Sequence, residues 1–333
     1  MLLFALPTIL LGLSGLGAAF CGMPDLTDED HAIMRQLQAN TSNRLDTRAV
    51  SIDSIQVYVH VVTDSNLNDL YTDDIQKNID VLNEEFADTA FDFELVDIRA
   101  IVYQYDKELK WNSYAEKAIK RHRIGTADTL NIYLVPRLFD GVFGYTTMPS
   151  AFKGNPLDDG IVIIRDAVPK LKDNGASLGL ALVHEVGHWL GLAHTFDGGC
   201  SEPGDYIDDT PAEIGGSTGC PVGRDSCPDM PGLDPIHNHM SYYSDECKSE
   251  FTRGQMRLME DTWKKYRDAH RPQTTKTKHP PPTKHLRPHG KPSHSGIKHS
   301  HSRTKHSHTG TKSTPSSTKS TPSSTKAKQT KAG

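Results

Sequence analysis

The chain has 333 residues and a formal net charge of −5, with 36% hydrophobic and 24% charged residues. This small net charge is the sum of an acidic part and a basic part of the chain. Residues 271–333 hold 14 of the 37 Lys and Arg and no acidic residue, which leaves 23 against all 42 Asp and Glu in residues 1–270, or +14 against −19. Because no aromatic residue lies among the charges of the basic part, nucleic-acid binding by base stacking is not expected.

The first residues of the chain are apolar. Leu2–Leu13 is followed by small residues up to Ala19 and then by polar sequence. This order predicts a secretory signal peptide over residues 1–19 and therefore an exported, extracellular protein. A membrane anchor is the alternative, but the stretch is short for a bilayer span and Pro7 interrupts it.

The middle of the chain predicts strands that alternate with helices, and hence an α/β (α+β) domain over residues 49–270. Apolar alternation or a short buried apolar run predicts a strand, and a 3.6-residue apolar spacing predicts a helix. The expected strands are 51–62, 91–102, 130–135, 141–148 and 160–164. The expected helices are 72–86, a weaker one over 107–122, and 177–192. The chain beyond Gly191 is rich in Gly, Pro, Asp and Cys, which predicts a half dominated by loops.

Eleven residues, H-E-V-G-H-W-L-G-L-A-H from His184 to His194, carry the chemistry. His184 and His188 stand one helical turn apart, so both imidazoles project from the same face. Gly191 can adopt a left-handed conformation that ends the helix and returns the chain, which makes His194 a third ligand. Three histidines with a fourth position left for water are typical of catalytic zinc, and Glu185 is free to act as a base. An ordinary packed histidine is the alternative for each ring alone.

Four cysteines, Cys200, Cys220, Cys227 and Cys247, follow the zinc motif. An even set in an exported protein predicts two disulfides, and the spacing leaves three pairings open. A second metal cluster is the alternative, but no C-x-x-C pair is present.

Residues 271–333 consist mainly of Lys, His, Ser, Thr and Pro, with a lysine at every seventh position from Lys284 to Lys326. The repeat offers no apolar a and d positions for a coiled coil, and its composition predicts a disordered tail. Such a tail would hold the protein to an acidic cell-wall or surface polymer, carry O-linked sugar, or bind metal loosely through its eight histidines. A solvated spacer without a partner is the alternative.

The zinc motif resembles that of the metzincin clan, and within it the pappalysin-like family, which includes secreted fungal metalloproteases. Asn238-His239-Met240-Ser241-Tyr242 resembles the Met-turn of the family, and Thr195 stands where astacins carry Glu. Ile79–Phe86 and Gly204–Pro211 also resemble family hallmarks. The similarity spans about residues 50 to 265 and excludes the tail.

This resemblance implies a metzincin-type fold, with a twisted mixed sheet, a backing helix and the zinc helix in the upper half and a disulfide-stapled lower half. It implies that Met240 forms the floor of the zinc site and that Tyr242 donates a hydrogen bond to the tetrahedral intermediate. A substrate would lie extended along the edge strand 141–148. The disulfide pairs implied by the family are Cys200–Cys227 and Cys220–Cys247.

Two further sites rest on the resemblance. Bacterial relatives bind calcium at the loop that corresponds to Asp205, Asp209 and Thr210, although a solvated acidic loop is the alternative.

Pappalysin precursors can carry Cys-Gly in a pro-segment, where the thiolate caps the zinc. Cys21-Gly22 matches that pair without the preceding Arg, which implies a latency switch within a pro-segment of residues 20–48; an incidental cysteine is the alternative. Asn40 in this segment begins a glycosylation sequon, N-T-S.

Together these features predict a secreted zinc metalloendopeptidase that hydrolyses peptide bonds in extracellular proteins. Zinc would activate a water molecule, and Glu185 would serve as the general base. A catalytically inactive zinc-binding adhesion protein and a metal-sequestering His-rich protein are the alternatives.

Overall fold

The computed structural model describes residues 21–42, 52–63, 72–104, 108–169, 177–215 and 219–268. The predicted signal peptide, the predicted end of the pro-segment and the basic tail lie outside these residues. The chain divides into two units, Met1–Thr274 and Thr275–Gly333, and every described residue belongs to the first. None of the helices in the described part of the chain combines the length and apolarity that crossing a membrane requires.

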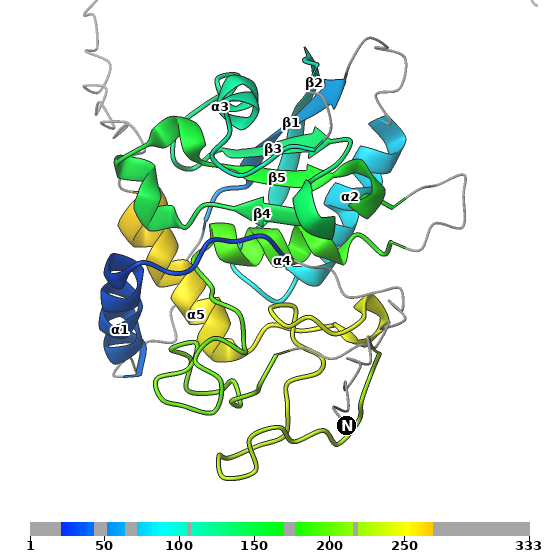
Figure 1. Ribbon diagram of the computed structural model, residues 1–333. Coiled ribbons are helices and arrows are strands. Elements are labelled where there is room, and N and C mark those ends of the chain that lie inside the picture. The colour runs from blue at the N-terminus through cyan, green and yellow to red at the C-terminus, as the bar shows by residue number, and fades with distance from the viewer. Residues whose placement is uncertain are drawn as a thin grey trace, which may run out of the picture. The chain divides into compact units, whose positions relative to one another are not determined.

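A mixed sheet flanked by helices forms one half of the first unit (Figure 1). The strands are β1 (Ile55–Thr63), β2 (Phe93–Val102), β3 (Leu130–Val135), β4 (Gly144–Thr146) and β5 (Ile161–Ile164). The helices are α1 (Asp28–Ser42), α2 (Thr72–Glu85), α3 (Tyr114–Lys120), α4 (Leu180–Trp189) and α5 (Arg253–Thr262). A π-helical turn, Trp263–Arg267, continues α5.

The sheet has the strand order β2-β1-β3-β5-β4. β1 pairs in parallel with β2 and β3, and β3 pairs in parallel with β5, whereas β4 is antiparallel to β5 and forms one edge. Every residue of β3 is buried, as expected for a parallel strand with both faces covered. The mixed sheet confirms the fold class that the sequence predicted.

Apolar packing fixes the two faces of the sheet. On one face Val57 and Ile132 pack with Ile79 of α2 and Val183 of α4, and on the other face Tyr133 packs with Ile119 of α3. Each fully buried side chain of this size contributes roughly 1.5–3 kcal/mol of transfer free energy. We call this half, residues 52–192, the sheet region.

Residues 193–252 form a loop region that carries the second half of the site. Between α4 and α5 the described residues contain one 3₁₀ turn, Asp245–Cys247, and no strand. Disulfides Cys200–Cys227 and Cys220–Cys247 close this region, with Cα–Cα distances of 5.4 and 5.5 Å. These are the two pairs that the family resemblance implied.

Several predicted boundaries are wrong. The helix expected over 107–122 is reduced to α3, because Asn112 has φ +56° and Ser113 then caps the helix by accepting a hydrogen bond from Glu116 N. The strand expected over 141–148 is reduced to β4. The helix expected over 177–192 begins only after Gly179, which has φ +88°, and ends at Trp189. Helices α1 and α5 were not predicted from the sequence.

Candidate metal centre

Helix α4 carries the first half of the site. All ten of its residues are buried, because the helix lies between the sheet and the loop region. Gly191, beyond the end of the helix, has φ +102°, and a Cβ atom there would lie 2.6 Å from the Thr262 side chain. Only glycine tolerates both constraints, so Gly191 makes the reversal that returns the chain to His194.

Three imidazoles converge at this point. His188 Nε2 lies 3.1 Å from His184 Nε2 and 3.1 Å from His194 Nε2. His184 Nδ1 lies 2.8 Å from the carbonyl oxygen of His239, and His188 Nδ1 lies 2.8 Å from that of Leu192. These carbonyl oxygens keep the proton on Nδ1, so both Nε2 lone pairs face the same point. Burial lowers the pKa of His184 and His188 well below the usual value, which keeps the rings neutral.

The donor set fits zinc. Lone pairs this close repel one another unless a cation lies between them. A tetrahedral zinc ion with Zn–N bonds of ~2.0–2.1 Å would hold its ligand nitrogens about 3.3 Å apart. The ligand atoms of His184, His188, His194 and Cys21 all lie within 4.8 Å of one another, so the sulfur is within reach of the same ion.

The third histidine, His194, is held from the loop region. The Phe196 ring stacks on the His194 ring with centroids 4.6 Å apart and planes at 11°. Asp197 accepts a hydrogen bond from the backbone N–H of His194 at 3.0 Å, and its other carboxylate oxygen lies 3.7 Å from His194 Nδ1. A carboxylate beside Nδ1 favours the tautomer that leaves Nε2 free to bind a metal.

Glu185 is buried beside the three histidines. Burial raises the pKa of its carboxyl group to about 8, although the Cys21 thiol and the Lys248 ammonium act in the opposite direction. A divalent cation bound alongside would lower that pKa. The edge strand β4 passes close by, because a Cβ atom on Gly144 would lie 3.0 Å from Glu185 Cγ. A substrate strand added at this edge would therefore pass Glu185 directly.

The segment 238–242, which resembles a Met-turn, packs against helix α4. Met240 is fully buried, and a Cβ atom on Gly187 of α4 would lie 2.3 Å from its sulfur, so the two elements are in direct contact. Tyr242 Oη lies 3.1 Å from His194 Nε2. Burial, with Cys21 and Glu185 nearby, raises the pKa of Tyr242, so its hydroxyl stays protonated and can donate.

The N-terminal segment occupies the site. Cys21 pairs with Gly144 in a parallel bridge, Gly22 N–H donates to Gly144 O at 2.8 Å, and Tyr242 Oη donates to Cys21 O at 3.1 Å. The Cys21 sulfur lies 3.5 Å from a Glu185 carboxylate oxygen. A Cβ atom on Gly22 would lie 2.8 Å from the Val142 side chain, which explains glycine after the cysteine. In Figure 1 this segment, dark blue, runs between β4 and α4.

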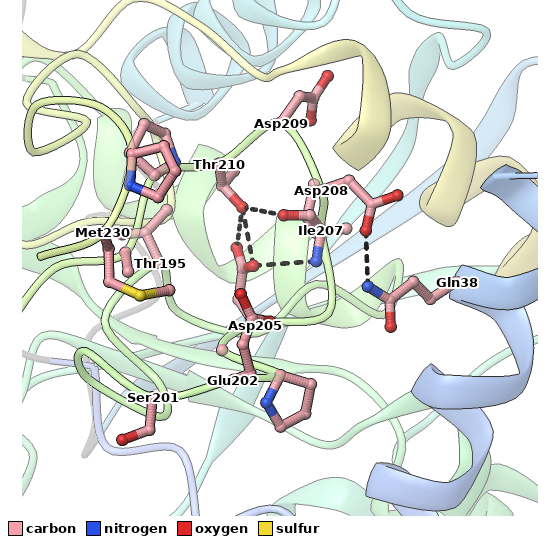
Figure 2. Close-up of a pocket in the computed structure, with 15 residues that line it drawn as sticks. Gln38, Thr195, Ser201, Glu202, Asp205, Ile207, Asp208, Asp209, Thr210 and Met230 are labelled. Carbon is pink, nitrogen blue, oxygen red and sulfur yellow. Dashed lines mark hydrogen bonds between the residues drawn. The ribbon is translucent and has the colours of Figure 1, made fainter.

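The candidate calcium residues are brought together only in part (Figure 2). The Thr210 hydroxyl donates to both carboxylate oxygens of Asp205, at 2.7 and 2.8 Å, in a cavity of about 290 Å³. Asp209 instead accepts a hydrogen bond from Gly254 N–H at the start of α5, at 2.9 Å. Gln38 of α1 reaches the same loop and donates to Asp208 at 2.7 Å. Asn40, the sequon residue, lies in α1.

The fold and the site define a metalloprotease of the metzincin type, and the comparisons with known proteins name the family. The profile described as Peptidase_M43, pregnancy-associated plasma protein-A, matches residues 113–264. An extracellular metalloprotease of Pyricularia oryzae is 40% identical over 258 residues, which cover 74% of this chain and 89% of that protein. One of Neurospora crassa is 41% identical over 222 residues, which cover 64% and 76%.

Solved structures agree. Mature mirolysin of Tannerella forsythia, in complex with a cleaved peptide, superposes with a TM-score of 0.54 at 26% identity, covering 65% of this chain and 93% of that one. A promirolysin mutant of the same species gives a TM-score of 0.55 at 24% identity, covering 71% and 87%, which shows the fold. This chain belongs to the pappalysin-like family of metalloproteases.

Sequence reasoning missed several residues around the site. Helix α1 had a readable signal in the spacing of Met34 and Leu37, both buried, but it was not predicted. Gly144 and Asp197 gave no signal of their own, because their roles depend on which segments the fold brings together. The same holds for Glu213, a fully buried carboxylate in the loop region.

Proposed function

We propose that this protein is a secreted zinc endopeptidase that acts on extracellular proteins, with Glu185 as its general base and Cys21 as a latency switch. The observation that carries the proposal is the convergence of three histidine nitrogens beside one buried carboxyl group. Zinc, when bound, supplies an electrophilic centre that polarises a peptide carbonyl and acidifies water.

The residues of the chain divide the remaining work. His184, His188 and His194 hold the ion, and the edge strand β4 aligns an extended substrate by strand addition. Glu185 takes a proton from the attacking water and passes it to the leaving amine. The burial of this carboxyl group suits that role. Tyr242 stays protonated and donates to the developing oxyanion. Met240 supports the helix that bears two of the ligands.

Digestion of casein tests the proposal. Activity should disappear when 1,10-phenanthroline removes the metal and return when stoichiometric zinc is added. Glu185→Gln should lower turnover by about 10²–10⁴-fold, because it removes the proton acceptor, while zinc content measured by mass spectrometry stays at one ion per chain. Turnover by Glu185→Gln near that of the unmodified chain would refute the assigned role.

Latency has its own test. The segment from Cys21 to Gly22 pairs with Gly144 of the edge strand along which we propose that a substrate lies, and a thiolate is a good zinc ligand. Cys21→Ser in the full chain should raise casein hydrolysis at least about tenfold, because a hydroxyl is a far weaker ligand than a thiolate. Equal activity of the two chains would leave Cys21 as an incidental residue.

Export and processing complete the proposal. The similarity to extracellular metalloproteases supports secretion after removal of residues 1–19. N-terminal sequencing of protein recovered from culture medium would identify that cleavage and a second one at the end of the predicted pro-segment, near Arg48. Attachment of the tail to acidic polymers, glycosylation of Asn40 and calcium binding at Asp205, Asp209 and Thr210 stay predictions.

A further inference from the structure

Glu213 lies in the loop region with no exposed side-chain surface. Three hydroxyl groups donate to its carboxylate. Oε1 accepts from Thr195 Oγ1 at 2.5 Å and from Ser241 Oγ at 2.8 Å, and Oε2 accepts from Tyr243 Oη at 2.7 Å. A carboxylate can accept several such bonds at once, and buried bonds to a charged group are the strong ones.

Each of these hydroxyls belongs to a residue that is adjacent in sequence to a residue of the proposed metal centre. Thr195 follows the third ligand, His194. Ser241 lies between Met240 and Tyr242, and Tyr243 follows Tyr242. One carboxylate oxygen thus bridges the loop that carries the third ligand to the Met-turn, and the other oxygen holds the residue after the proposed oxyanion donor.

The backbone alone joins these two segments weakly. Thr195 N–H donates to Met240 O at 3.3 Å, which is long for an amide–carbonyl bond. The separation of His194 from Tyr242 must nevertheless stay fixed, because Tyr242 Oη lies 3.1 Å from His194 Nε2. The shorter bonds through Glu213 therefore supply the stronger restraint on their separation.

The charge of Glu213 is balanced from the same region. Arg224 Nη1 lies 3.8 Å from Glu213 Oε2, donates to Tyr243 Oη at 2.7 Å and pairs with Asp234. Asp234 accepts in turn from Ser226, the residue before Cys227 of a disulfide. The network therefore ends on a covalently closed part of the loop region.

We propose that Glu213 is a positioning residue for the metal centre, which sets the separation of His194 from Tyr242 through Thr195, Ser241 and Tyr243. The inference rests on the proposed zinc site. It assigns to Glu213 a function beyond stability: removal of the carboxylate changes the geometry and the retention of the bound metal.

The test uses full-length chains loaded with one Co²⁺ or one Zn²⁺ per chain. The visible absorption of Co²⁺ reports ligand geometry, and transfer of zinc to 4-(2-pyridylazo)resorcinol reports how fast the site releases metal. Glu213→Ala should alter the Co²⁺ bands and accelerate zinc release by about 10–100-fold, as loss of a supporting hydrogen bond around metal ligands commonly does. Glu213→Gln keeps an acceptor oxygen but loses the second one, so its effect should be intermediate.

Glu116 offers a matched control, because it is also a buried glutamate but lies in α3, paired with Lys120 at 3.0 Å. Glu116→Ala should lower the thermal unfolding temperature and leave the Co²⁺ spectrum and the release rate unchanged. If Glu213→Ala does not fold, Thr195→Val and Tyr243→Phe each remove one donor and carry the same test. Thr195→Val as a single substitution should accelerate zinc release. Combined with Glu213→Gln, it should add little to the acceleration that Glu213→Gln causes alone.

The outcomes separate the two claims. If the unmodified chain holds no stoichiometric Co²⁺ or Zn²⁺, the proposed zinc site itself fails. If the unmodified chain holds the metal and the Glu213 variants lose stability but keep its spectrum and its release rate, the site stands and the positioning function of Glu213 is refuted.

Discussion

The sheet region and the loop region meet at the same three histidines but hold their share of the site in different ways. The sheet region presents His184 and His188 from one buried helix, which apolar side chains of the sheet and of α2 keep in place. The loop region positions His194 and Tyr242 mainly with disulfides and buried polar contacts, whereas its Met240 joins the apolar core of the sheet region. The same ion can thus be bound by a packed core on one side and a cross-linked polar network on the other.

This difference has an energetic consequence. Apolar burial is tolerant of small shifts because it has no direction, whereas a hydrogen-bonded network stabilises one arrangement and is costly to satisfy only in part. Damage to the sheet region should therefore appear mainly as lost stability, and damage to the loop region mainly as a misplaced ligand.

The largest expected effect concerns a buried charge in the π-helical turn that continues α5. Arg267 is fully buried, stacks 3.3 Å above the Trp189 ring centroid and pairs with Asp159 at 3.2 Å, and burial lowers its pKa to about 10. Arg267→Met should cost about 3–5 kcal/mol of unfolding free energy, because it removes one of the two guanidinium partners of Asp159 and the hydrogen bonds to the carbonyl oxygens of Ala127 and Trp189. Urea denaturation measures the loss, with the exposed Arg257→Met as control. A cost no greater than that of Arg257→Met would mean that the sheet region does not depend on this pair.

The two disulfides sharpen the comparison within the loop region. Both close loops of 27 residues, so chain entropy gives each a contribution of about 3–4 kcal/mol to stability. Replacing Cys200 and Cys227, or Cys220 and Cys247, by alanine should therefore cost a similar amount in guanidinium denaturation. Zinc release should accelerate in both variants, whereas Arg267→Met should leave it unchanged.

The contact between the two regions is tested at Gly187. Gly187→Ala places a methyl group 2.3 Å from the Met240 sulfur, and the flexible methionine must move away. We expect a loss of about 1–3 kcal/mol in thermal unfolding, as for overpacking elsewhere. In a Met240→Ala background the obstacle is absent, so Gly187→Ala should cost less there than in the unmodified chain. An equal cost in both backgrounds would contradict the steric explanation.

The smallest expected effect concerns pH in the sheet region. His60 is buried against Tyr133, and burial lowers the pKa of its imidazole below 6.5. Below pH 6.5 the unfolded chain therefore binds a proton at this imidazole that the folded chain does not bind. The contribution of neutral His60 to stability is complete above pH 6.5 and decreases as the pH falls toward the folded-state pKa. His60→Gln should flatten this slope between pH 7.5 and 5.5 in denaturant titrations. An unchanged slope would assign the decline to other groups.

The sequence was informative wherever a local pattern decides the outcome. The spacing from His184 to His194, the freedom of Gly191 and the apolar run of β3 all depend on neighbours in the chain. The structure brings the three histidines together, gives Gly191 a positive φ and buries every residue of β3. Boundaries failed where one residue overrides a periodic pattern, as Asn112 does before α3. Glu213 and Asp197 could not be predicted, because the hydroxyl and amide groups that they serve come from turns whose arrangement only the whole fold sets.

The parallel bridge between Cys21 and Gly144 also bears on how activity would begin. A peptide tethered to the site it blocks competes at an effective concentration that reaches the millimolar range for short flexible linkers, far above that of most extracellular proteins. Dissolved substrates would therefore rarely displace it by mass action. A single cut in the connecting chain would remove the tether, and the segment would then be held only by its own contacts, such as those of α1 with α5.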